Sequence, residues 1–179
     1  MVNLRIPGPT PCPDDILEAV GQPMINHRGP EFLEIINRIT ERLQQAFMTK
    51  NDVFILTTAG TGGMESAIVN VLSPGDHVVA VTIGVFGDRF VQVAQAYGAK
   101  VTKVEATWGK AADPQQLRDV LKANSDVKAV IITHNETSTG VTNDLEALAK
   151  VVKEDPNRLL LVDGVSSMGS IPLPVDAWE

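Results

Sequence analysis

The chain has 179 residues and a formal net charge of −7, with 44% apolar and 21% charged residues. This composition is typical of a globular domain with a sizeable core and argues against intrinsic disorder. The acidic balance argues against nucleic acid as a partner, and no apolar run is long enough to cross a membrane.

The N-terminal residues, 1–20, predict an extended arm followed by a short helix. Residues 1–12 carry three prolines, which favour extended backbone. The helix "PDDILEAVG" has Pro13 near its start and Gly21 just past its end. The start lacks the apolar stretch of a signal peptide, and the single cysteine, Cys12, suits a reducing compartment. We therefore expect a cytoplasmic protein.

Residues 21–179 predict an α/β domain. Residues 30–47 have apolar residues at helical spacing. After them, short apolar runs alternate with helical patterns, which is typical of βαβ units and a mostly parallel sheet covered by helices on both faces. Asp113 and Asn143 are the expected N-caps of two of these helices, the latter in a capping box with Glu146. The expected strands are residues 53–58, 77–82, 100–105, 127–134 and 158–164.

Two features lie where ligands bind in such sheets, just after the carboxyl ends of strands. The turn "AGTGG" contains Gly60, Gly62 and Gly63, which would let a helix start point its free N–H groups at an anion such as phosphate. Packing alone is the alternative for these glycines. Asp163 follows the apolar run "LLLV", and a buried carboxylate needs a cation or strong donors. A cap or a local turn is the alternative for this aspartate.

Several other site types are not supported. The three histidines share no metal-ligand spacing with one another or with Cys12, so we expect no metal site. No G-x-S-x-G elbow and no Walker loop is present. The dinucleotide fingerprint fails because Glu65 stands where Gly or Ala is required.

Five stretches in order carry a family resemblance: "IPGPTPCP", "HRGPEF", "TTAGTGGMESAIVNVLSPGD", "ITHNETSTGV" and "LLLVDGVSSMGSIPLPVD". Together they resemble the N-terminal half of a class V, fold-type I, pyridoxal-phosphate-dependent aminotransferase, and are most similar to the alanine–glyoxylate and serine–pyruvate enzymes. The resemblance implies a three-layer α/β/α large domain with a mostly parallel sheet. Residues 21–179 would be the N-terminal part of this cofactor-binding domain, incomplete at its C-terminus and without the small domain.

The resemblance also implies roles for seven residues around pyridoxal 5′-phosphate. Asp163 would pair with the pyridinium nitrogen, and a carboxylate there raises the ring pKa and deepens the electron sink. Phe86 would stack on the ring, where the family often has Trp. The other implied cofactor contacts are Ala59, Gly60 and Thr61 with the phosphate, Thr137 near the phenolic oxygen, and Val165 under the ring.

The implied reaction is amino transfer between a small amino acid, such as alanine or serine, and a 2-oxo acid, such as glyoxylate or pyruvate. The family's Schiff-base lysine and substrate-binding arginine come later in the chain, and neither Lys150 nor Lys153 matches that lysine. We therefore expect these 179 residues to be an inactive fragment when alone. Family members are typically homodimers, so a homodimer or a complementary C-terminal piece is expected. The alternatives are a noncatalytic or hydrogenase-associated member, or another class V enzyme such as a cysteine desulfurase.

Overall fold

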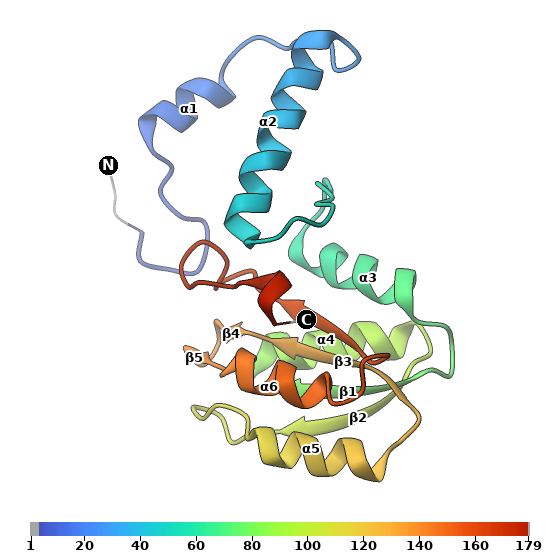
Figure 1. Cartoon of the computed structure of the whole chain (residues 1–179). Helices are drawn as coiled ribbons and strands as arrows, with labels where there is room; N and C mark the ends of the chain where they lie inside the picture. Colours follow the sequence, from blue (N-terminus) through green and yellow to red (C-terminus); the bar gives the residue numbers. More distant parts are fainter. Residues whose placement is uncertain (1–3, 179) are drawn as a thin grey trace.

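A computed structural model gives the fold of residues 4–178, so the first three residues of the predicted arm and Glu179 lie outside the described part. Its centre is a four-stranded parallel sheet in the order β2-β1-β3-β6 (Figure 1). A short antiparallel pair, β4 (Asn135–Glu136) and β5 (Val141–Thr142), follows β3. The strands of the main sheet are β1 (His77–Thr82), β2 (Lys100–Glu105), β3 (Val127–Thr133) and β6 (Leu159–Asp163).

Two pairs of helices cover the sheet, as the alternation of strands and helices predicts. On one face, Val78 and Ala80 of β1 pack in a cluster with α3 (Gly60–Val71) and α4 (Val85–Ala96). On the other face, Val79 and Val81 pack in a cluster with α5 (Pro114–Ala123) and α6 (Leu145–Val152). Both faces of the parallel sheet are therefore buried, and the predicted three-layer architecture is confirmed.

Two further helices lie outside these layers. Helix α1 (Asp14–Val20) and helix α2 (Pro30–Phe47) contain no buried residue and extend away from the sheet (Figure 1). The segment that follows α2 is hydrogen-bonded to the 3-10 turn η1 (Val175–Ala177), because Asp176 accepts a 2.8 Å hydrogen bond from the Lys50 amide. None of the helices in residues 4–178 is both long and apolar enough to cross a lipid bilayer.

One expected strand is wrong. Residues 53–58 form no strand, and the Phe54 side chain is 80% exposed. A strand needs a partner edge for its amide and carbonyl groups, and no segment within residues 4–178 pairs with residues 53–58. An apolar run with β-branched residues indicates a preference for burial, but it does not show whether a partner strand is present.

One of the two expected N-caps is also wrong. Asp113 caps α5 as predicted, and its carboxylate accepts a 2.8 Å hydrogen bond from the Gln115 amide. The cap of α6 is Asp144 instead of Asn143. The Asn143 side chain is buried, accepts a hydrogen bond from the Ala112 amide and donates one to the Thr133 carbonyl, each at 2.9 Å. Because these bonds use its side chain, Asn143 does not cap α6.

Candidate functional site

Asp163 lies at the carboxyl end of β6, and one of its two carboxylate oxygens has no hydrogen-bond partner within residues 4–178. It pairs in register with Thr133 of β3, and the His134 amide donates a 2.9 Å hydrogen bond to its carbonyl. Its Oδ1 accepts a 3.0 Å bond from the Val165 amide, whereas its buried Oδ2 has no partner among residues 4–178. Burial raises the pKa of Asp163, and the nearby negative charge of Glu136 raises it further, against the opposing effect of the Val165 amide. A buried carboxylate oxygen without a partner is suited to accept a hydrogen bond from a cationic donor.

Glu136 is a second carboxylate at this edge, and its acceptors are satisfied. Its side chain is fully buried at the start of α4. Oε2 accepts hydrogen bonds from the amides of Phe86 and Gly87, both at 3.1 Å. Oε1 accepts from the Ser138 amide at 3.1 Å and the Ser138 hydroxyl at 2.6 Å. Of the two carboxylates, Asp163 is therefore the one with an acceptor left for a ligand.

Sequence reasoning missed Glu136, although a signal was present. Like Asp163, it is an acidic residue placed just after a long apolar strand. The first glycine of "GVFG", Gly84, was a further indication, because a residue without a side chain leaves space for a neighbouring group. A Cβ at Gly84 would lie 2.6 Å from Glu136 Cγ, so the absence of a side chain there makes room for the carboxylate.

Three other predicted site residues follow neighbouring strands of the sheet. Phe86 lies in the first turn of α4, after β1, and is 38% exposed. Thr137 is half-buried between β4 and β5, after β3, and Val165 is largely exposed, two residues after β6 ends. Because β1, β3 and β6 are adjacent and parallel, their carboxyl ends bring Phe86, Thr137 and Asp163 to one edge.

The residues predicted to bind phosphate form the start of α3. Ala59 is an extended N-cap whose side chain makes no capping hydrogen bond, and Ala59, Gly60 and Thr61 are exposed. A short turn joins the end of α3 to the start of β1, so α3 runs antiparallel to the strands and begins on the side where they end (Figure 1). The first amides of a helix have no intrahelical partner and favour an anion.

Only one of the three glycines in this turn is required by close packing. A Cβ at Gly62 would lie 1.9 Å from the Thr58 hydroxyl oxygen. A Cβ at Gly60 or Gly63 would meet nothing within 4 Å. The open space in front of Gly60 leaves the helix start accessible to a ligand.

His134 is a buried polar residue beside Asp163 that the sequence did not single out. Its ring packs edge-on against Trp178, with centroids 6.5 Å apart and planes at 90°. Its Nδ1 is buried and has no partner in the described part of the chain. Burial lowers the pKa of His134, which favours the neutral imidazole.

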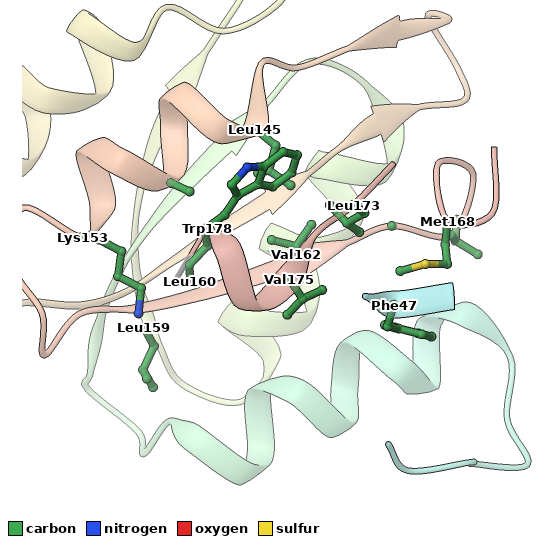
Figure 2. Close-up of a pocket in the computed structure, with 13 residues that line it drawn as sticks. Phe47, Leu145, Lys153, Leu159, Leu160, Val162, Met168, Leu173, Val175 and Trp178 are labelled. Carbon is green, nitrogen blue, oxygen red and sulfur yellow. The ribbon is translucent and has the colours of Figure 1, made fainter. Parts of the chain in front are cut away.

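An apolar cleft lies beside this site, along the edge of β6 that pairs with no other strand within residues 4–178. It has a volume of about 580 Å³. Figure 2 shows the side chains of Leu145 on α6, Leu160 on β6 and Trp178 around it. Val165 is the only predicted cofactor residue in its lining. The cleft is thus an uncovered apolar flank of the sheet and differs from the polar edge that Asp163 occupies.

The polar edge combines three chemical features. They are a helix start suited to an anion, an exposed aromatic ring, and a carboxylate with an open oxygen. These features complement a phosphorylated aromatic ring that carries a positive charge, as the protonated pyridine ring of pyridoxal phosphate does. The residues present therefore fit that cofactor.

Comparison with known proteins relates the chain to aminotransferases. The family model for class V aminotransferases matches residues 8–179. The soluble hydrogenase 42 kDa subunit of Anabaena cylindrica is 45% identical, with the match covering 97% of this chain and 46% of that protein. The L-aspartate–glyoxylate aminotransferase of Paracoccus denitrificans is 39% identical, with coverage of 97% and 45%.

Solved structures give the same result. The alanine–glyoxylate aminotransferase of Nostoc sp. superposes with a TM-score of 0.91 at 33% identity, over 97% of this chain and 46% of that one. The chain thus spans under half the length of the relatives it matches. With the family model matched over nearly its whole length, the chain belongs to the class V aminotransferases.

Proposed function

We propose that the protein carrying this chain is a pyridoxal-phosphate-dependent aminotransferase in which Asp163 holds the proton on the cofactor's ring nitrogen. The observation that carries this proposal is the buried Oδ2 of Asp163, which has no partner within residues 4–178. Bound pyridoxal phosphate supplies an electron sink for a substrate carbanion. A carboxylate beside the ring nitrogen stabilises its protonated form, and the positive ring in turn stabilises a carboxylate that burial alone would favour as the neutral acid.

The other residues would bind and orient the cofactor. The amides at Ala59, Gly60 and Thr61 would hold the phosphate, because a helix start favours negative charge. Phe86 would supply a flat apolar surface for one ring face and Val165 would pack on the other. The Thr137 hydroxyl would donate a hydrogen bond to the phenolic oxygen.

Substrates and assembly follow from the family relationship. We propose amino transfer between a small amino acid, such as alanine or serine, and a 2-oxo acid, such as glyoxylate or pyruvate. We also propose a cytoplasmic homodimer, or association with a complementary C-terminal piece. Residues 1–20 would form an arm toward the partner, and residues 21–179 would belong to the cofactor domain. The apolar flank along β6, with Leu160 and Val162, supports a covering segment.

The test is Asp163→Asn in the full-length protein. Loss of a charged hydrogen-bond partner costs about 1.5–3 kcal/mol, so the transamination rate is expected to fall roughly tenfold or more. Asp119→Asn is the control, because Asp119 is an exposed carboxylate on α5. Unchanged turnover and cofactor content in Asp163→Asn would refute the assignment. Loss of soluble protein in that variant would indicate a structural role instead.

A hydrogenase-associated role is the second candidate. It is favoured by the 45% identity to the Anabaena protein, whose name describes a hydrogenase subunit. Such a member need not bind pyridoxal phosphate. A full-length protein that co-purifies with hydrogenase activity and shows no pyridoxal phosphate binding in an absorbance titration would support this candidate over the aminotransferase.

A further inference from the structure

Glu136 connects the loop after β3 to the start of α4. Its carboxylate is fully buried and accepts hydrogen bonds from the Phe86 and Gly87 amides on one oxygen. The other oxygen accepts from both the amide and the hydroxyl of Ser138. An anion at a helix N-terminus also interacts favourably with the helix dipole. Four donors satisfy this charge, so Glu136 can remain buried without a cation.

The two loops interlock at further points. The Ser138 hydroxyl accepts a 3.0 Å bond from the Val85 amide, and the Thr139 hydroxyl donates a 3.2 Å bond to the Ile83 carbonyl. A Cβ at Gly84 would lie 2.8 Å from Glu136 Cδ, so the carboxylate fills the space that a side chain at 84 would take. The polar groups of residues 136–139 thus fix the backbone that carries Phe86.

The Phe86 ring is not fixed by burial. It is 38% exposed, in contrast to Phe90 one turn later, which is 3% exposed. The position of the ring therefore depends on its backbone, and its backbone amide is bonded directly to Glu136. A platform for stacking must be held in a narrow range of positions to be effective.

We infer that Glu136 is a positioning residue for the cofactor ring, which acts by fixing the backbone of Phe86. This inference rests on the proposed function, because it takes Phe86 as the stacking residue. Glu136 has no acceptor left for the cofactor, so its effect passes through the first turn of α4. A role limited to helix capping would change stability alone, whereas a positioning role changes the affinity for the ring.

The test is a double-mutant cycle of Glu136→Gln and Phe86→Ala in the full-length protein, with pyridoxal 5′-phosphate and inorganic phosphate as separate probes. Each single variant is expected to weaken pyridoxal phosphate binding by about three- to tenfold, the size of an aromatic stacking contribution. In the Phe86→Ala background, Glu136→Gln is expected to have less than about a twofold further effect, because coupled residues are non-additive. The phosphate affinity stays unchanged in every variant.

His77→Ala is the matched control for lost stability. His77 is also buried and hydrogen-bonded, to Asp126 and Thr102, but it lies at the opposite end of β1. Its loss is expected to lower Tm without changing the affinity for pyridoxal phosphate. If Glu136→Gln does not fold, Ser138→Ala provides the milder variant, since it removes the hydroxyl that bonds both Glu136 and Val85.

Two results would overturn the inference while leaving the proposed function intact. One is normal affinity for pyridoxal phosphate in the folded Glu136 or Ser138 variant. The other is an equal loss in the wild-type and Phe86→Ala backgrounds, which would mean that Glu136 acts without Phe86. A wild-type protein that binds no pyridoxal phosphate would refute the proposed function and this inference together.

Discussion

The His134 amide donates a 2.9 Å hydrogen bond to the Asp163 carbonyl, which extends the pairing of β3 and β6 to the end of the sheet. The backbone of Asp163 is therefore held by sheet hydrogen bonds, while its side-chain Oδ2 has no partner within residues 4–178. The Val165 amide then binds only one of its two carboxylate oxygens. The fixed backbone positions the carboxylate, and its unpaired oxygen remains available to a ligand.

The first prediction concerns the pH dependence of stability without cofactor. Burial raises the pKa of Asp163 above its ordinary 3.8, so the folded state binds more protons than the unfolded state between the two values. Stability from this group is then lost as pH rises through that window. We expect the Tm difference between Asp163→Asn and wild type to increase with pH there. Calorimetric scans at several pH values measure it, and a constant difference would contradict the raised pKa.

The second prediction separates two glycines of the phosphate turn. Gly62→Ala places a Cβ against the Thr58 hydroxyl, and such overpacking costs about 1–3 kcal/mol. Gly63→Ala meets open space inside α3 and is expected to be neutral or to gain about 0.5–1 kcal/mol from helix propensity. Urea unfolding of both variants makes the comparison. Equal effects at the two positions would mean that Thr58 does not pack there.

The sequence predicts the covered parts of the fold well, because burial leaves a periodic pattern. Helix α2 and strands β1 and β2 begin and end at the expected residues. Residues 53–58 carry the same apolar signal but lie exposed, since pairing depends on a second segment that local sequence does not describe.

Some residues of the site can likewise be predicted from local sequence, whereas others depend on contacts with distant segments. Asp163 is predictable because a charge after an apolar strand is costly. Glu136 carries a similar signal, but its meaning lies in its contacts with Phe86 and Gly87, about fifty residues away. The choice between Asn143 and Asp144 as a cap likewise depends on a distant partner, the Ala112 amide.

The third prediction concerns the open edge of the sheet. Residues 1–179 expressed alone are expected to self-associate, because β6 pairs with β3 on one side only within residues 4–178, and an unpaired strand edge beside an apolar cleft favours association. Val162→Lys, on β6 in the lining of that cleft, is expected to reduce association, whereas Val69→Lys, at an exposed position on α3, is the charge control. Light scattering over a concentration range measures it. A wild-type chain that stays monomeric at high micromolar concentration would contradict this view.

The fourth prediction concerns the tie between α2 and the C-terminal turn. The Asp176 carboxylate accepts bonds from the Thr49 hydroxyl and the Lys50 amide, which lower its pKa. An acid whose pKa is lowered on folding stabilises the folded state above its ordinary pKa and loses that effect as pH falls through the folded value. Asp176→Ala is expected to speed proteolysis at residues 48–52, and wild type should show the same change in acid. Asp176→Asn, which keeps one acceptor oxygen, is the control. Equal cleavage of all three proteins at neutral pH would argue against the tie.

The central claim is that Asp163 keeps the ring nitrogen of bound pyridoxal phosphate protonated. The most direct measurement is the NMR chemical shift of an isotope-labelled pyridine nitrogen in the full-length protein, at a pH where the free cofactor has lost that proton. We predict a protonated nitrogen in wild type and a neutral nitrogen in Asp163→Asn, because an amide cannot supply the negative charge. A neutral nitrogen in wild type, or a protonated nitrogen in both proteins, would contradict the account.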